Sequence, residues 1–253
     1  MRGRAPRDSR LDVALVEAGL FTSRQRAQAA LALGLVLVDG RPAGKPSLQV
    51  RCGAALDAEE PMPFVGRGGL KLQAALEHFD LTATGRVALD VGASTGGFTD
   101  CLLRAGAGRV YALDVGTGQL APSLAADPRV VNLEGTDIRR LPPRSLDPAP
   151  DLAVVDVAFI SLRLVLPHVL PQLRADAPAE VVALIKPQFE VGPSRVGKGG
   201  VVRSEAYRQQ AVADVTVAAA GLGLHHRGTM PSPVAGGDGN QEYLACWFFG
   251  GTL

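Results

Sequence analysis

Residues 87–105 place a short apolar segment, a glycine-rich turn and a helix-forming segment directly after one another, and this order leaves few folds open. The segment VALDV has the length and apolar character of a buried strand, and the turn GASTGG lets the backbone bend sharply and approach a ligand. We expect a helix from Phe98 to Ala105, capped by Ser94 or Thr95. A strand that enters a helix through such a turn is typical of a parallel sheet with helices on its faces.

Six further strand-like segments follow, most of them separated by helix-like stretches. They read RVYALDVG, RVVNLEG, DLAVVDV, EVVALIK, GLHHRGTM and EYLACWFF. The alternation predicts an α/β fold, a doubly wound and mostly parallel seven-stranded Rossmann-like sheet. A chain of 253 residues with 47% hydrophobic residues has room for this domain and one smaller domain.

The glycine-rich turn predicts a nucleotide-like cofactor, and two cofactors compete for it. NAD-binding turns have the spacing G-x-G-x-x-G and direct a helix N-terminus at a pyrophosphate. Here the spacing is G-x-S-x-x-G, preceded by Asp90, an acid that would repel a pyrophosphate but suit the cationic sulfonium and amino groups of S-adenosylmethionine. Asp114 ends the next strand, where it would bind ribose hydroxyls, and Asp137 follows the third, where it would hold the adenine amino group. These acids favour S-adenosylmethionine over NAD.

The expected cofactor-binding residues lie at the ends of the first four strands. They are Asp90, Gly92, Ser94, Thr95, Gly96, Gly97, Phe98, Asp114, Val115, Asp137, Ile138 and Asp156. Phe159 would either stack on the adenine or fill the core. His225 and His226 lack metal-ligand spacing with other His, Cys or Asp, so we expect no metal.

The residues near this predicted site indicate which chemical group accepts the methyl. Methylation of a base amino group commonly uses an Asn/Asp-Pro-Pro-aromatic loop after the fourth strand, and VVDVAFISL contains no Pro-Pro there. Methylation of a pyrimidine carbon needs a cysteine, and Cys52, Cys101 and Cys246 lie elsewhere. A ribose 2′-hydroxyl has a high pKa, and it needs a positioned base and a partner for its developing negative charge.

Composition supplies a candidate for that base. Only four of the 26 basic residues are lysine, and lysine, unlike arginine, can act as a base when burial or crowding lowers its pKa. Lys186 ends the fifth predicted strand, and Lys71 opens a helix-like stretch before the glycine-rich turn. Asp156 ends the fourth strand and Glu242 begins the last. These four residues form the expected catalytic set.

This set and its surrounding motifs resemble the FtsJ-type ribose methyltransferases, which carry a Lys-Asp-Lys-Glu tetrad. The resemblance is closest to the TlyA, or haemolysin A, family, and it is carried by GRGGLKL, DVGASTGGFTD, ALDVGTGQL, DVAFISL, IKPQFEVG and GNQEYL. It implies 2′-O-methylation of cytidine in ribosomal RNA, with S-adenosylmethionine as donor. It also implies Lys186 as the base, or as the group that orients and stabilises the oxyanion. Asp156 and Glu242 would hold the lysines and the ribose, and Lys71 would act on Lys186 through like charge.

The first 50 residues are organised differently. Apolar residues recur at helical spacing over residues 11–20, and Ser23 is placed to cap a second helix that Gly34 ends. LVLVDG then alternates apolar residues and ends in Asp39-Gly40, a hairpin-turn signal. This order resembles the S-four-type RNA-binding domain, a small α+β fold. The segments RLDVALVEAGL, TSRQRAQAAL, GLVLVDG and GKPSLQV carry the resemblance.

Charge supports the same interpretation. Residues 1–56 hold nine Arg or Lys against four Asp or Glu, a formal charge of +5, whereas the remainder carries −4. The N-terminal part is therefore the expected anion-binding part, and its basic side chains would contact RNA phosphates. The expected RNA-binding residues are Arg10, Arg24, Arg26, Arg41, Lys45, Arg51 and Arg67. We expect this domain over residues 1–57, a linker rich in Pro and Gly over 58–70, and the methyltransferase domain over 71–253.

Other functions stay open at this point. The chain could be a ribosome-associated assembly factor whose methyltransferase-like domain is catalytically silent, although an intact tetrad argues against that. Pore formation, suggested by the haemolysin name, is not supported, because no apolar run of about 18 residues is present and no signal core follows the basic N-terminus. Three scattered cysteines fit a reducing compartment. We therefore expect a cytoplasmic protein whose partner is ribosomal RNA or ribosomal subunits, with no membrane; its oligomeric state stays open. Lys198, in a basic loop with Arg195 and Arg203, either contacts RNA or is solvated.

Overall fold

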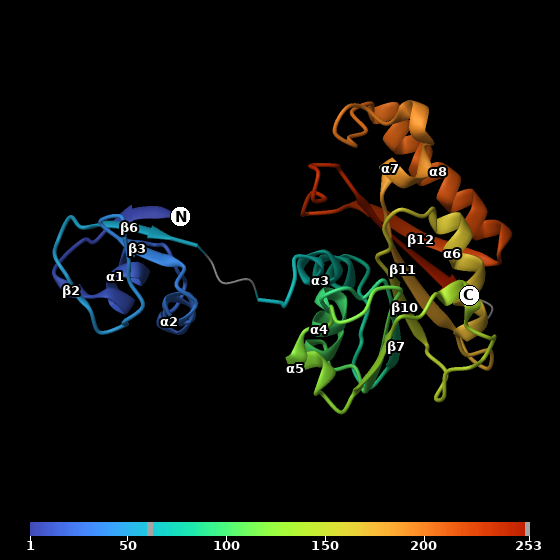
Figure 1. The fold of residues 1–253 in the computed structure, drawn as a ribbon, viewed down its shortest axis with the longest axis horizontal. Helices are drawn as coiled ribbons and strands as arrows, with labels where there is room; N and C mark the ends of the chain where they lie inside the picture. The colour runs from blue at the N-terminus through green and yellow to red at the C-terminus, as the bar shows by residue number, and fades with distance from the viewer. Residues whose placement is uncertain (60–62, 251–253) are drawn as a thin grey trace. The chain divides into compact units, whose positions relative to one another are not determined.

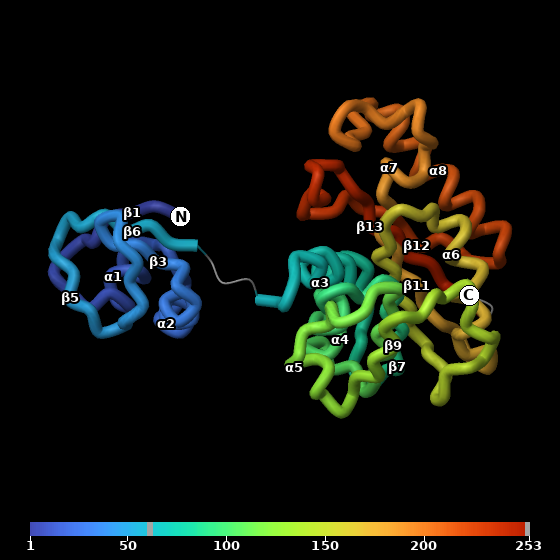
Figure 2. Tube along the Cα trace, viewed as in Figure 1, coloured from blue at the N-terminus to red at the C-terminus, as the bar shows by residue number. Residues whose placement is uncertain are grey.

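The chain divides into two units, Met1–Pro63 and Phe64–Leu253, in the computed structural model (Figures 1 and 2). The structure describes residues 1–59 and 63–250. One hydrophobic core lies in the first unit, and two lie in the second, one on each face of its sheet.

Seven strands form one sheet in the second unit, as predicted. Its order is β12-β13-β11-β10-β7-β8-β9. The five strands from β7 to β11 run parallel, and β13 is antiparallel to both of its neighbours. The strands are β7 Val87–Val91, β8 Arg109–Asp114, β9 Val130–Glu134, β10 Leu152–Val155, β11 Ala179–Ile185, β12 Leu224–Pro231 and β13 Tyr243–Phe249.

Helices cover both faces of this sheet, which makes the fold doubly wound (Figure 1). Residues from α3 (Gly68–His78) and α4 (Gly97–Arg104) share a buried cluster with Ala88, Val110 and Val154. Residues from α6 (Leu162–Val169) and α8 (Glu205–Gly221) share the other with the neighbouring strand positions, because successive strand side chains face opposite sides. Shorter elements are α5 Pro122–Ala125, α7 Pro187–Glu190 and the 3₁₀ turns η1 Ile138–Arg140, η2 Leu170–Gln172 and η3 Pro193–Arg195.

The strand order reverses direction between β7 and β10. From β7 the chain adds β8 and β9 on one side, then crosses to add β10 and β11 on the other. The first residue after β10 still contacts β7: the Asp156 amide donates a hydrogen bond of 2.9 Å to the Val91 carbonyl. Ligands of such sheets bind in the crevice at this reversal, outside the carboxyl ends of the strands.

Two local predictions in this unit were wrong. Helix α4 begins at Gly97 with Gly96 as its N-cap, and no side chain caps it, so neither Ser94 nor Thr95 has that role. Lys71 does not open its helix either, because α3 already begins at Gly68. The second unit starts at Phe64, whose side chain packs against the core beside α3. Residues 64–70, the end of the expected linker, therefore belong to the second unit, and 60–62 lie outside the described residues.

The first unit is a small α+β fold. Its four-stranded sheet has the order β1-β6-β3-β4, and β2 pairs with β5. The predicted cap and turn are confirmed: Ser23 accepts a hydrogen bond from the Arg26 amide, and Asp39-Gly40 has φ of 50° and 75°, the left-handed pair of a two-residue hairpin turn. The elements are β1 Arg2–Arg4, β2 Ser9–Arg10, α1 Leu11–Glu17, α2 Arg24–Ala32, β3 Val36–Val38, β4 Arg41–Pro42, β5 Gln49–Val50 and β6 Ala55–Ala58.

Among the described residues, none of the helices combines the length and the apolar character needed to span a bilayer.

Candidate functional site

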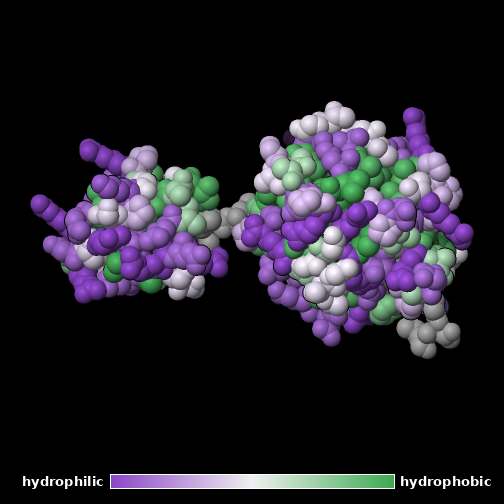
Figure 3. Space-filling view, turned by 90° about the horizontal axis from the view of Figure 1, so that it is seen from below, coloured by the Kyte–Doolittle hydropathy of each residue, from purple (hydrophilic) through white to green (hydrophobic). Residues whose placement is uncertain are grey.

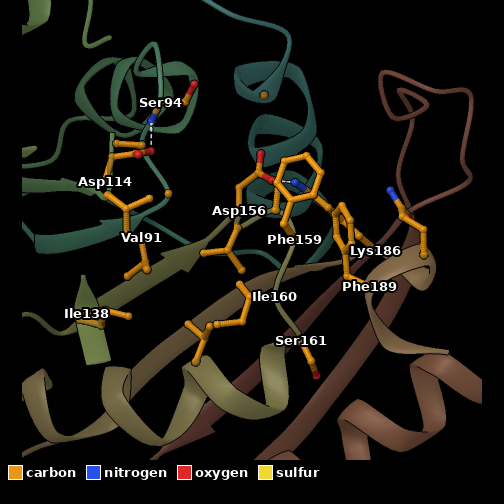
Figure 4. Close-up of a pocket in the computed structure, with 18 of the residues that line it drawn as sticks. Val91, Ser94, Asp114, Ile138, Asp156, Phe159, Ile160, Ser161, Lys186 and Phe189 are labelled. Atoms are coloured by element: carbon orange, nitrogen blue, oxygen red, sulfur yellow. Dashed lines mark hydrogen bonds and ion pairs between the residues drawn. The ribbon is translucent and has the colours of Figure 1, made fainter. Parts of the chain in front are cut away.

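A pocket of about 1430 Å³ opens at the carboxyl ends of the parallel strands, at the point where the strand order reverses (Figure 4). Its wall takes residues from the turn after β7, the ends of β8 and β10, and the segment after β11. One half is bounded by the glycine-rich turn, Asp114 and Ile138. The other half is bounded by Asp156, Phe159 and Lys186.

The glycines of the turn are required by close packing. Gly92 has φ of 88°, and a Cβ there would lie 2.4 Å from the Asp156 carbonyl oxygen. Gly96 has φ of 96°, and a Cβ there would lie 2.2 Å from Cδ1 of Leu124. Positive φ and contact this close exclude larger residues. The turn is thus pressed against the loop after β10 on one side and α5 on the other.

Asp114 fixes the shape of the turn and faces the pocket. Its two carboxylate oxygens accept hydrogen bonds from the Ser94 amide at 2.8 Å and the Gly116 amide at 2.7 Å (Figure 4). A carboxylate oxygen has more than one acceptor position, so both retain capacity for ligand hydroxyls. Val115, which follows, is 71% exposed.

Asp137 lines the same half of the pocket, but its carboxylate is already engaged. It caps η1 by accepting from the Arg139 amide, and it pairs with the Arg139 guanidinium at 2.7 Å. These hydrogen bonds lower the pKa of Asp137 to about 2. An adenine amino group would therefore share this carboxylate with Arg139, a partner that sequence reasoning missed.

Asp90 does not face the pocket. Its side chain is wholly buried beneath the turn, and it is not one of the residues that line the cavity. Thr99 Oγ1 donates a 2.7 Å hydrogen bond to Oδ2, and Oδ1 has no hydrogen-bond partner within residues 1–59 and 63–250. Burial raises the pKa of Asp90 to about 7, and the nearby charges of Asp156 and Asp114 push it the same way. The direct contact expected between Asp90 and a cationic cofactor is therefore not available in this geometry.

The four expected catalytic residues form two ion pairs. Lys186 Nζ lies 2.7 Å from Asp156 Oδ1, and both residues line the pocket; the contact lacks the alignment of a hydrogen bond. Lys71 Nζ lies 2.5 Å from Glu242 Oε2. Neither Lys71 nor Glu242 lines the pocket, and they are only 8% and 2% exposed.

The two pairs are neighbours. Gly68 lies one helical turn before Lys71 in α3, and a Cβ at Gly68 would stand 3.7 Å from Asp156 Oδ2. Thus the half-buried Asp156 and Lys186 form the pocket-lining face of the set, and the buried Lys71 and Glu242 lie behind it.

Phe159 stands at the mouth of the pocket. It is 91% exposed, so it does not fill the core, and its backbone has a φ of 64°, which is unusual for a large side chain. Its ring centroid lies 5.2 Å from that of Phe189 (Figure 4). The φ value marks a backbone held in place by its surroundings.

Glu190 ties the residues just after Phe159 to the segment after β11. It is 5% exposed and accepts hydrogen bonds from Ser161 Oγ at 2.6 Å and from the Leu162 amide at 2.8 Å. Burial raises its pKa above the ordinary value. The loop after β10 and the segment after β11 are thus joined at three successive places, by the Asp156–Lys186 pair, the two phenylalanines and Glu190. Sequence reasoning missed Phe189 and Glu190, although both lie in the quoted segment IKPQFEVG.

The expected RNA-binding residues of the first unit are all exposed. Arg10 and Arg24 both pair with Asp12, at 3.1 and 2.8 Å, and the Asp12 side chain has no exposed surface. The pKa of Asp12 is strongly lowered by these hydrogen bonds. The other members of the set are Arg26, Arg41, Lys45 and Arg51, and Arg67 lies in the second unit, where it lines the pocket.

Residues 64–249 match the family model described as FtsJ-like methyltransferase. The chain belongs to the FtsJ-like methyltransferase family. The FtsJ-like domain is preceded by a match to the S4 domain over residues 9–55. The chain is 47% identical, over 94% of its length and 89% of the relative, to the 16S/23S rRNA (cytidine-2′-O)-methyltransferase TlyA of Mycobacterium tuberculosis. It is 36% identical, over 93% of its length and 98% of the relative, to Hemolysin A of Brachyspira hyodysenteriae.

Solved structures agree with this assignment. A protein of Streptococcus thermophilus described as a hemolysin, 39% identical, covers 98% of this chain and 90% of its own with a TM-score of 0.74. A methyltransferase of Listeria monocytogenes is 12% identical and covers 73% of this chain and 99% of its own, with a TM-score of 0.53. At this identity the match supports only the fold, not the function. The predicted sheet and the predicted S4-type fold of the first unit are therefore both confirmed.

Proposed function

We propose that this chain transfers a methyl group from S-adenosylmethionine to the 2′-hydroxyl of a cytidine ribose in ribosomal RNA. The observation that carries the proposal is the Asp156–Lys186 pair on the wall of the pocket, 2.7 Å apart. The relative that is 47% identical supports the choice of cytidine in ribosomal RNA. We further propose ribosomal subunits as partners and the cytoplasm as the location.

The half of the pocket beside the glycine-rich turn fits S-adenosylmethionine. Gly92 and Gly97 line the cavity with backbone, whereas the expected cofactor residue Gly96 packs against α5 and does not line it, and Asp114 offers oxygens for two ribose hydroxyls. Ile138 and Val115 supply apolar surface for an adenine ring. When bound, the cofactor supplies an electrophilic methyl group on a sulfonium. Asp90 would act from beneath the turn, through Thr99 and the local charge, and not by contact.

The other half would hold the acceptor ribose. During transfer the 2′-oxygen forms a bond to the methyl carbon and loses its proton, so it needs an acceptor for that proton and a group that stabilises developing negative charge. Lys186 can meet either need. As a neutral amine it would take the proton. As an ammonium it would hold the oxygen in line, and the Asp156 carboxylate beside it would accept the proton. Asp156 would orient Lys186 in both cases.

Lys71 and Glu242 would have a supporting role. Their pair is buried one helical turn from Gly68, which itself stands beside Asp156. Because Glu242 already neutralises Lys71, the effect of Lys71 on Lys186 through like charge would be weak. The pair would instead hold α3 and the start of β13 together behind the acceptor site.

Phe159 offers a flat apolar face beside the acceptor half. Bases that leave a stack are commonly received by aromatic rings. We propose that Phe159, supported by Phe189, stacks on the base of the acceptor nucleotide. Adenine stacking, the other role expected for Phe159, is less compatible with its place in the acceptor half of the pocket.

The test is transfer of a tritiated methyl group from S-adenosylmethionine to ribosomal RNA, offered as free RNA and as isolated subunits. Label in the 2′-O position of a cytidine is the expected result. A folded protein that binds RNA and cofactor but transfers no label would overturn the proposal in favour of a silent assembly factor.

A further inference from the structure

The segment Gly192–Arg203 runs along the rim of the pocket directly after α7, the short helix that Lys186 precedes. We call this segment the arm. Five of its residues line the same pocket as Lys186, namely Gly192, Pro193, Val196, Gly197 and Gly200. The arm is therefore part of the surface that an acceptor strand must cross to reach Lys186.

All charged residues of the arm are basic. Arg195, Lys198 and Arg203 are exposed, and no acid occurs between Glu190 and Glu205. Among the residues that the structure describes, no carboxylate pairs with any of the three. Arg195 lies over the Tyr207 ring, with 5.1 Å from its guanidinium carbon to the ring centroid. That contact restrains the side chain and leaves its donors available.

The arm is anchored even though it is rich in glycine. Asn240 is 1% exposed, accepts a hydrogen bond of 2.9 Å from the Val202 amide and donates one of 2.8 Å to the Gly200 carbonyl. The Gly197 amide donates to the Val201 carbonyl at 3.0 Å, which closes a turn around Lys198. Asn240 lies two residues before Glu242, so the arm is fixed to the segment that carries part of the catalytic set.

We propose that the arm binds the phosphate backbone of the RNA strand next to the nucleotide being methylated. The inference rests on the proposed function and adds a substrate-binding surface to it. Guanidinium and ammonium groups bind phosphate strongly, and an anchored arm would place them without a large cost in ordering. Such contacts would set the position of the strand and would not select its sequence. The arm would hold the ribose over Lys186 while the first unit binds RNA elsewhere.

The test compares the full-length chain with the triple variant Arg195→Ala, Lys198→Ala and Arg203→Ala. Single-turnover methylation is measured over a range of RNA and salt concentrations. We expect the RNA concentration for half-maximal rate to rise at least tenfold, and the rate at saturating RNA to change by less than about threefold. The slope of log affinity against log salt concentration should become shallower by about 2. Each of the three lost single-strand phosphate contacts contributes about 0.7 to this slope. Binding of S-adenosylmethionine should not change.

Matched variants separate the local effect from a general loss of charge. Arg109→Ala removes a positive charge at the start of β8, at the amino ends of the parallel strands and thus opposite the pocket, and it should leave the RNA dependence unchanged. Asp238 lies near the arm, since a Cβ at Gly200 would stand 3.9 Å from Asp238 Oδ2. Asp238→Asn removes this negative charge and should lower the RNA concentration required by about twofold or more.

The outcomes are distinguishable from failure of the proposed function. If the wild-type chain methylates RNA but the triple variant keeps its RNA dependence and salt slope, the arm does not bind phosphate. If the wild-type chain methylates no RNA, the proposed function fails, and direct RNA binding by the same variants then decides the arm proposal. Equal RNA affinity in wild type and triple variant would overturn it there as well.

Discussion

Lys71 and Glu242 are 171 positions apart in the chain and form a buried ion pair, with 2.5 Å between Nζ and Oε2. They come from the first turns of α3 and from the residue just before β13. The pair joins the beginning of the FtsJ-like domain to its last strand. Because neither residue lines the pocket, the structure separates this buried pair from the half-buried, pocket-lining pair Asp156–Lys186.

The buried pair predicts a stability phenotype. Glu242→Gln leaves the Lys71 ammonium buried without a countercharge, which costs about 3–5 kcal/mol of unfolding free energy. Urea unfolding monitored by circular dichroism measures this. Glu205→Gln removes a carboxylate from an exposed pair with Arg208 and should change stability little. The double variant Lys71→Met with Glu242→Leu should recover much of the loss, and a double variant as unstable as Glu242→Gln would contradict this account.

Replacing Lys186 should lower the methylation rate even when the positive charge is kept. Lys186→Arg keeps a positive charge next to Asp156, but arginine does not give up its proton and its planar fork has a different shape. We expect the single-turnover rate to fall at least 100-fold, with cofactor binding intact. Lys198→Arg is the matched control, because phosphate binding tolerates either cation, and it should keep its rate. Full turnover in Lys186→Arg would show that this residue supplies only positive charge. Lys71→Arg should be less harmful than Lys186→Arg.

Replacing Phe159 should weaken RNA binding without lowering the stability of the fold. Its ring is exposed and its φ of 64° is strained, so Phe159→Gly should relieve strain on the order of 1 kcal/mol and be at least as stable as Phe159→Ala. Both variants should raise the half-saturating RNA concentration about tenfold or more. Leu164→Ala removes another exposed apolar side chain that lines the pocket, and it should have a smaller effect. An unchanged RNA dependence in Phe159→Ala would exclude base stacking.

Asp90 predicts a pH dependence of stability. Its pKa is about 7 in the folded chain, above the ordinary value of about 3.9 in an unfolded one. The unfolded state therefore loses its proton first, and the contribution of this residue to stability falls as pH rises from about 4 to about 7. Asp90→Asn, which keeps an acceptor for Thr99, should be more stable than wild type at pH 8 by up to a few kcal/mol, and the difference should shrink at pH 5. Urea unfolding at the two pH values tests this, and a difference that grows toward pH 5 would have the wrong sign.

The N-terminal unit predicts separable RNA binding. The second unit has its own core, so removal of residues 1–56 should leave cofactor binding within about twofold. RNA affinity should fall, and its salt dependence should become weaker, since exposed arginines and Lys45 are removed. Filter binding at several salt concentrations measures both. Equal RNA affinity after the deletion would remove the role assigned to this unit.

The strands were predictable because each is a local pattern. The segments VALDV, LAVV and VVALI have the apolar composition of buried strands, and Asp156 and Lys186 follow their strands at the expected end. Parallel strands bring such ends to one edge of the sheet, so the meeting of Asp156 with Lys186 followed from topology. The Asp39-Gly40 turn and the Ser23 cap were predictable for the same reason, since both depend on a few adjacent residues.

The sequence by itself determined the order of strands and helices, the family, and which residues could take part in the chemistry. Only the tertiary structure decided the surroundings of each: that Asp90 is buried and away from the pocket, that Glu242 neutralises Lys71, and that Phe159 is exposed. Spacing along the chain reports how a segment folds, because that depends on neighbours in sequence. Burial, charge pairing and the direction of a side chain depend on residues brought together from distant segments, and those appear only when the sheet and its helices are assembled.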